Sequence, residues 1–288
     1  MSTRRFTRGT LLLLAVISLS TNFAFADTMG SVFVTGHDSD FHAFLGGNAL
    51  GAQHIIQDAL TFTRNGNTNP ILLIESNLNN SALGDHTDSE QGLIASGYTA
   101  GATPGNHYVK VNAATFSSLA LATLISTYSA IFVPSDHGGT LNEADLAALD
   151  ARSADILSYV NAGGGLFALA EDGNHSGGHA AALFGFLPFL ATSAPLGEAE
   201  GGNTLTAFGS SLGLVNSDIN GNFSHNIFTS TGGMNIVDRD ANGEILSLAF
   251  RGQLTSSGAV PEPSSIVLLV TVVGLVGRKA YRGRSAGA

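Results

Sequence analysis

The 288-residue chain contains no cysteine. Without cysteine the protein can form no disulfide framework, and it has no thiol that could act as a nucleophile. Enzymes that work through a catalytic cysteine are therefore excluded as functions of this chain.

Basic residues are scarce between the two ends of the chain. Seven of the twelve lysines and arginines lie in residues 1–26 and 259–288, which leaves five against 21 Asp and Glu in residues 27–258. The net charge of this central region is 5 − 21 = −16. A surface with this charge repels phosphate backbones, so the composition disfavours nucleic-acid binding. It suits an extracytoplasmic protein, or one that collects cations.

The N-terminus has an apolar run, residues 11–19, that is too short to span a bilayer comfortably. Three arginines precede the run: Arg4, Arg5 and Arg8. An A-x-A site, Ala24-Phe25-Ala26, follows it. This order predicts a secretory signal peptide over residues 1–26 that is cleaved after Ala26. The alternatives are an uncleaved anchor and a first helix of the fold.

The C-terminus has a pattern of three parts. A proline-flanked acid, Pro261-Glu262-Pro263, is followed by a short apolar run over residues 264–277. Four basic residues then end the pattern: Arg278, Lys279, Arg282 and Arg284. An apolar run before a basic cluster stops in a membrane with the cluster in the cytoplasm. Residues 259–288 resemble the PEP-CTERM sorting tail, which implies an exported protein of the envelope or exopolysaccharide layer and processing by a membrane-embedded exosortase.

Apolar strands and amphipathic helices alternate in the first part of the central region. The predicted strands are residues 31–35, 70–75, 108–111, 128–134 and 166–170. The predicted helices are residues 48–62, 89–95, 114–126 and 142–161. Strands that are apolar throughout, alternating with helices, predict a three-layer, flavodoxin-like α/β domain with a parallel sheet.

The pattern changes after residue 184, where we expect a β-rich C-terminal portion. Residues 235–250 predict two strands around an Asn242-Gly243 turn, a strong hairpin signal. Residues 238–243 also match the first half of a calcium loop, but Ala249 stands where that loop requires a bidentate Glu. The turn explains the same residues with fewer assumptions. We find no internal repeat or dividing linker, so residues 27–258 are predicted to form one domain.

Polar residues gather where four of the predicted strands end, and in an open parallel sheet ligands bind at this edge. These rim residues are His37, Asp38, Asp40, His42, Glu75, Asp136, His137, Glu171, Asp172, His175 and His179. Imidazole and carboxylate ligands together suit zinc, iron or manganese. The ligand candidates for such a divalent metal are His37, Asp38, His42, Asp136, His137, His175 and His179. The alternative is a polar rim that forms turns and caps helices without any ligand.

Two segments, residues 133–139 (VPSDHGG) and 161–171 (NAGGGLFALAE), are separated by a predicted helix. This order resembles the class I glutamine amidotransferase-like superfamily, including its ThuA-like branch, over residues 32–187. The resemblance implies that the second segment ends in the elbow that carries the family's nucleophilic cysteine, here Ala170-Glu171. Hydrolysis of glutamine by a thiolate is excluded because the chain lacks cysteine. Ser176, the nearest hydroxyl, lacks the leading glycine of a G-x-S-x-G elbow.

Two functional hypotheses follow. In the first, the protein is an exported, exosortase-sorted envelope or extracellular-matrix protein, transiently anchored in the inner membrane, whose amidotransferase-like domain is non-catalytic. Its partners would be the exosortase and exopolysaccharide or envelope components. In the second, the domain is a metal-assisted hydrolase or carbohydrate-active enzyme, with Glu171 or Asp172 as the general base.

Overall fold

The computed structural model describes residues 29–75, 89–136, 141, 143–171, 183–187, 191–197, 201–255 and 258–260. The predicted signal peptide and the sorting motif lie outside these residues. Within the described ranges, no helix combines the length and the apolar character needed to cross a membrane.

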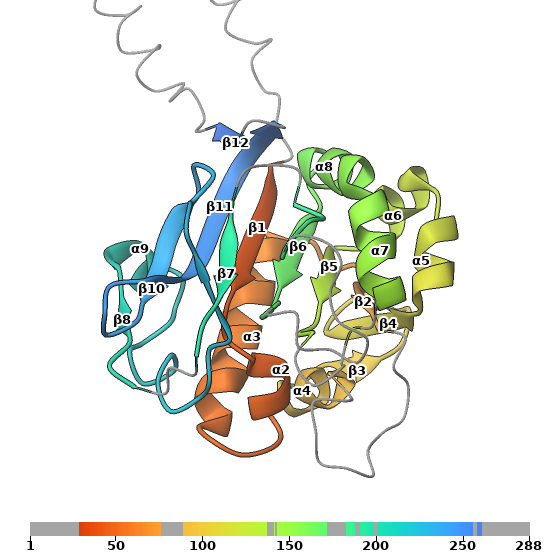
Figure 1. Cartoon of the computed structure of the whole chain (residues 1–288). Coiled ribbons are helices and arrows are strands. Elements are labelled where there is room, and N and C mark those ends of the chain that lie inside the picture. Colours follow the sequence, from red (N-terminus) through yellow and green to blue (C-terminus); the bar gives the residue numbers. More distant parts are fainter. Residues whose placement is uncertain are drawn as a thin grey trace, which may run out of the picture.

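A large mixed sheet forms the centre of the molecule (Figure 1). Five parallel strands lie side by side in this order: β4 (His107–Val111), β2 (Ile71–Ile74), β5 (Ala130–Val133), β6 (Gly165–Ala168) and β1 (Gly30–Thr35). The short β3 (Thr99–Ala100) extends the sheet beyond β4. Every residue of β1, β2, β5 and β6 is buried, as expected for parallel strands covered on both faces.

Helices cover both faces of this sheet, which confirms the predicted three-layer α/β class. One face is covered by α5 (Ala113–Ser118), α6 (Leu121–Thr127), α7 (Glu143–Ala151) and α8 (Ser153–Asn161). The other face is covered by α3 (Ala49–Arg64) and α4 (Glu90–Ala95). Neighbouring strand residues point to opposite faces, so Val32 joins the first core while Phe33 packs edge-on against Phe167 in the second.

Two of the predicted helices are each divided into two. The predicted helix 114–126 consists of α5 and α6, because Leu119 and Ala120 between them have extended backbone. The predicted helix 142–161 consists of α7 and α8, with the break at Arg152. The hydrophobic period did not show these breaks because both halves of each pair pack against the same face of the sheet.

The β-rich C-terminal portion extends the sheet beyond β1. β11 (Ile245–Thr255) pairs antiparallel with β1, and β10 (Asn235–Arg239) pairs with β11. The predicted hairpin is confirmed: Asp240 Oδ1 accepts the N–H groups of Asn242 and Glu244, and Gly243 has a φ of 88°. The carboxylate of Asp240 therefore closes a turn, as the turn hypothesis predicts. The smaller elements are α2 (Ser39–His42), β7 (Ser193–Pro195), β8 (Thr204–Leu205), α9 (Ala207–Ser211), β9 (Asn226–Phe228) and β12 (Gly258–Val260).

Three consecutive glycines, Gly163, Gly164 and Gly165, lead into β6, and each has a separate structural reason. Gly163 has a φ of 98°, which L side chains rarely adopt. A Cβ on Gly164 would lie 2.3 Å from the ring of Tyr159, and a Cβ on Gly165 would lie 2.5 Å from the carbonyl oxygen of Thr63 in α3. β6 therefore enters the sheet directly beneath α3 because its first residue has no side chain.

We expect the substitution Gly165→Ala to lower the free energy of unfolding by about 1–3 kcal/mol, because the added methyl group must displace α3. Urea denaturation measures the difference. Gly197→Ala is the control, since a Cβ there meets no atom within 4 Å, and we expect it to change stability by less than about 0.5 kcal/mol. Equal effects of the two substitutions would contradict the packing explanation.

Candidate functional site

The carboxyl-end edge of the parallel strands contains every described residue of the predicted rim. β2 and β5 are neighbours, but the helices that follow them, α4 and α7, cover opposite faces of the sheet. In open α/β sheets this reversal marks the crevice where ligands bind. Glu75 directly follows β2, and Asp136 comes three residues after β5. These two side chains therefore flank the position at which the fold favours a site.

The described rim residues are enclosed. None of them is more than 4 % exposed: His37, Asp38, Asp40, His42, Glu75, Asp136 and Glu171. Of the fifteen described acidic residues, six are not buried and nine are: Asp38, Asp40, Glu75, Asp136, Asp145, Glu171, Asp218, Asp238 and Asp240. The expectation that the negative charge lies on the surface is therefore wrong for most of the described carboxyl groups, which lie inside the fold.

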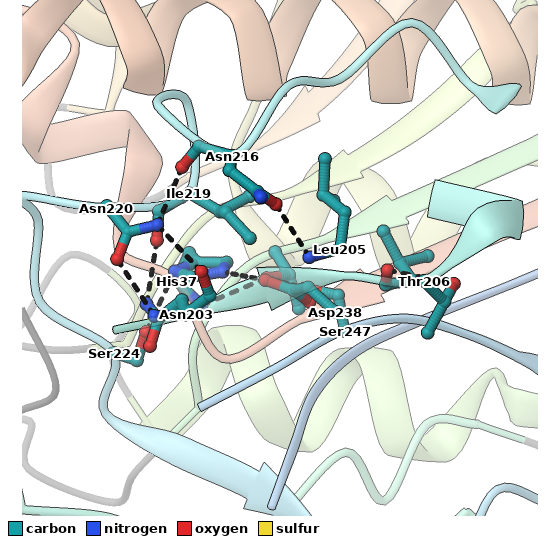
Figure 2. Close-up of polar contacts among 12 residues, drawn as sticks. His37, Asn203, Leu205, Thr206, Asn216, Ile219, Asn220, Ser224, Asp238 and Ser247 are labelled. Atoms are coloured by element: carbon teal, nitrogen blue, oxygen red, sulfur yellow. Dashed lines mark hydrogen bonds and ion pairs between the residues drawn. The ribbon is translucent and has the colours of Figure 1, made fainter. Parts of the chain in front are cut away.

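His37 lies at the centre of a buried polar network (Figure 2). Its Nε2 atom lies 2.6 Å from Asp238 Oδ2, and Ser224 Oγ lies 2.8 Å from its Nδ1 atom. The backbone N–H of His37 donates to Thr35 Oγ1, which lies 2.7 Å from Ser247 Oγ. The network joins the end of β1 to β10, to β11 and to the segment that leads into β9.

Ser224, His37 and Asp238 are the residue types of a hydrolase in which a histidine activates a serine, but Ser224 contacts Nδ1 and Asp238 contacts Nε2, the reverse of that triad. A nucleophile must also be reached by its substrate, and Ser224 is 0 % exposed. Together with Asp238, which is also 0 % exposed, it encloses the imidazole on both sides. The arrangement therefore supports the fold at this edge, and it satisfies polar groups that would otherwise be costly to bury.

Asp38 and Asp40 place two carboxyl groups against each other. Burial raises the pKa of Asp40 well above its usual value, and the neighbouring Asp38 carboxylate raises it further. The hydroxyl of Ser89 and the backbone N–H of Ser135, which lies 3.0 Å from Oδ2, act in the opposite direction. Asp40 Oδ1 is one of the buried oxygens that have no hydrogen-bond donor among the described residues. Burial and the neighbouring Asp38 both favour the protonated form of Asp40.

Other rim residues fix the backbone around the edge. Glu171 Oε2 accepts the N–H of Phe184, and the N–H of Glu171 donates to Asn226 Oδ1 at 3.1 Å. His42 Nε2 accepts the N–H of Phe223 at 3.4 Å. Asp38 Oδ2 lies 3.5 Å from His225 Nε2. These contacts are those of the polar-rim alternative, in which the side chains hold loops together.

The described part of the chain contains no complete metal centre. No three of its His, Asp and Glu side chains are placed to hold one metal ion together. His37, Asp38, His42 and Asp136 therefore do not form a centre among themselves. The remaining metal candidates, His137, His175 and His179, lie outside the described residues. The general-base candidate Asp172 and the hydroxyl of Ser176 lie outside them as well.

Sequence reasoning missed the segment that closes the rim. Residues 222–226 lie along the end of β1, and four of their five side chains are polar and buried: Asn222, Ser224, His225 and Asn226. In sequence the segment is a polar stretch far from any predicted strand. Ser224 is separated from His37 by 187 residues, and Asp238 by 201. A polar stretch of five residues carries no periodic pattern from which its position in the fold could be predicted.

Comparison with known proteins gives no match for this chain among protein-family models, curated proteins or solved structures. The resemblances to the PEP-CTERM tail and to the amidotransferase-like superfamily therefore stay predictions.

We expect Asp40→Asn to stabilise the protein at pH 8. The pKa of Asp40 is higher in the folded than in the unfolded protein, so stability falls as pH rises from the unfolded value toward the folded one. The neutral amide removes this cost, which is about 1.4 kcal/mol for each unit by which the pKa is raised. Urea denaturation should show a gain of about 1 kcal/mol or more at pH 8 that shrinks toward pH 4.

The control is Glu244→Gln, which removes one carboxylate from the β10–β11 turn, away from Asp38 and Asp40, and should not reproduce the gain at pH 8. A loss of stability in Asp40→Asn at every pH would contradict the repulsion between Asp38 and Asp40.

We expect His37→Ala to lower the free energy of unfolding by about 3–5 kcal/mol, because it leaves the Asp238 carboxylate buried without its partner. The double variant His37→Ala, Asp238→Ala should lose less than the sum of the two single losses. The control is His54→Ala: His54 also contacts an aspartate, Asp218, but its side chain is 52 % exposed, so the expected loss is below about 1 kcal/mol. Additive losses at positions 37 and 238 would mean that the network contributes no coupling.

Proposed function

We propose that this chain is an exported, exosortase-sorted protein of the cell envelope or extracellular matrix, and that its amidotransferase-like domain is non-catalytic. The signal-peptide pattern in residues 1–26 and the tail pattern in residues 259–288 support export and sorting. The absence of cysteine supports a domain that lacks the superfamily's chemistry.

One observation carries the non-catalytic part of the proposal. At the edge where an α/β domain holds its ligands, the described ionisable side chains are buried and engaged with neighbouring groups. Catalysis requires that such groups meet a substrate. Two pockets of the described part lie instead at the opposite edge of the sheet, on either side of Arg64.

A non-catalytic domain in this setting acts by binding. The proposed partners are exopolysaccharide or other envelope components, together with the exosortase that processes the tail. The burial of nine carboxyl groups makes collection of cations on the surface a poorer explanation of the acidic composition than the sequence suggested.

A second candidate function is a metal-assisted hydrolase or carbohydrate-active enzyme. It is favoured by one observation, the convergence of five carboxyl groups on the edge that contains the topological switch: Asp38, Asp40, Glu75, Asp136 and Glu171. In such an enzyme Glu171 or Asp172 would be the general base, and rim histidines would hold a divalent ion that activates water.

We expect the full chain, purified without chelator, to contain no stoichiometric zinc, iron or manganese by elemental analysis. The matched variants are His137→Ala, Glu171→Gln and, as a control that leaves the rim intact, Glu244→Gln. The non-catalytic proposal would be overturned in favour of the metal-assisted enzyme if the protein held a stoichiometric metal that His137→Ala loses and Glu171→Gln keeps.

A further inference from the structure

The two described ends of the chain lie at the same edge of the sheet, opposite the rim. Gly30 at the start of β1 pairs with Gly252, and Val260 at the end of β12 pairs with Gln253, the next residue along β11. In Figure 1, β12 and the start of β1 lie at the top of the molecule, whereas α2 and α4 lie at the bottom. The segments before Met29 and after Val260 therefore leave the domain from one end.

The loops and strand ends at this end contain no acidic residue among the described residues. They are residues 61–70, 101–107, 124–130, 160–165, 250–255 and 258–260, and their Lys or Arg residues are Arg64 and Arg251. The helix α8 lies at the same end (Figure 1), and its Asp155 is paired with Arg152, so that this pair adds no net charge. We call this surface the arginine edge. It contrasts with the rest of a central region whose net charge is −16.

Neither arginine is neutralised by a carboxylate among the described residues. The guanidinium of Arg64 donates to Ser129 Oγ and to the carbonyl oxygens of Asn69 and Gly105. The guanidinium of Arg251 donates to neutral oxygens of β1 and α3, and it lies 4.6 Å from the centre of the Phe62 ring. Arg64 is buried and Arg251 is exposed, so the positive charge that the arginine edge presents to anionic lipid headgroups is mainly that of Arg251.

The link between the domain and the predicted membrane segment is short. Only residues 261–263 separate Val260 from the apolar run that begins at residue 264. Three residues span at most about 11 Å when fully extended. The 16-residue helix α3 runs between the rim and the arginine edge, and at 1.5 Å per residue it is roughly 24 Å long. The rim is thus too far from the attachment point to reach the bilayer.

We infer that, while the C-terminal segment is anchored, the arginine edge faces an anionic bilayer and the carboxyl-rich rim faces away from it. The inference rests on the proposed function, which supplies the anchor. It adds an orientation: the edge with the buried acids and the segment 222–226 is presented to the envelope, on the side where a matrix partner can reach it.

The absence of cysteine allows a direct test, because a single introduced cysteine is the only thiol in the chain. Thr68→Cys, beyond the C-terminal end of α3, reports on the arginine edge. Leu50→Cys reports on the rim end of the same helix, where Leu50 is 68 % exposed. Each full-length variant is labelled with a fluorophore and inserted into vesicles of phosphatidylcholine and phosphatidylglycerol that contain a headgroup-labelled lipid quencher.

We expect the quencher to reduce the fluorescence of the Thr68→Cys label several-fold more than that of the Leu50→Cys label. Equal or reversed quenching in protein that floats with the vesicles would overturn the orientation and leave the proposed function standing. Protein that does not float with the vesicles would overturn the anchoring itself, and the orientation with it.

The contribution of charge is tested separately. Arg251→Gln should reduce the quenching of the Thr68→Cys label in anionic vesicles, whereas Arg239→Gln, at the β10–β11 turn on the other edge, should not. Unchanged quenching in Arg251→Gln would overturn the electrostatic part of the inference. If the Thr68→Cys label is quenched equally in vesicles of phosphatidylcholine alone, the short link and not the charge orients the domain.

Discussion

At the edge where the parallel strands end, the main physical constraint is that carboxyl groups are removed from water. An ionised carboxylate is expensive to bury unless it gains hydrogen bonds, an opposite charge or a proton. In this structure Glu171 gains a backbone N–H donor, Asp238 gains an imidazole, and Asp40 gains hydrogen bonds from Ser89 and Ser135 while burial and Asp38 raise its pKa. The segment 222–226 and the hydroxyl of Ser89 lie where they do because these groups need partners.

The sequence predicted the fold class and the position of the rim, since both follow from local patterns. Apolar runs mark β1, β2, β5 and β6, and polar residues follow each of them. It did not predict the break between α5 and α6, where two extended residues interrupt a continuous apolar stripe. Nor did it predict that the described rim residues are buried, because the segment 222–226 that covers them lies far along the chain, and no local pattern reports such a contact.

The interior position of the acids changes what the composition means. A net charge of −16 suggests a surface that interacts with cations, but most of the described carboxyl groups hold the domain together. The fold alone does not assign a function, since α/β sheets of this class serve many. What the geometry supplies is a polarised domain, with buried acids at one edge and two arginines and both chain exits at the other.

The pairing of β1 with β11 also governs when the domain can fold. β1 is the first described strand, yet six of its residues pair with residues 247–252, near the end of the folded region. A chain that crosses a membrane from its N-terminus must keep β1 without this partner until almost the whole domain has emerged. Such long-range pairing is slow to form, so, under the proposed export, the exposed edge of β1 is the part of the nascent protein most in need of protection from aggregation.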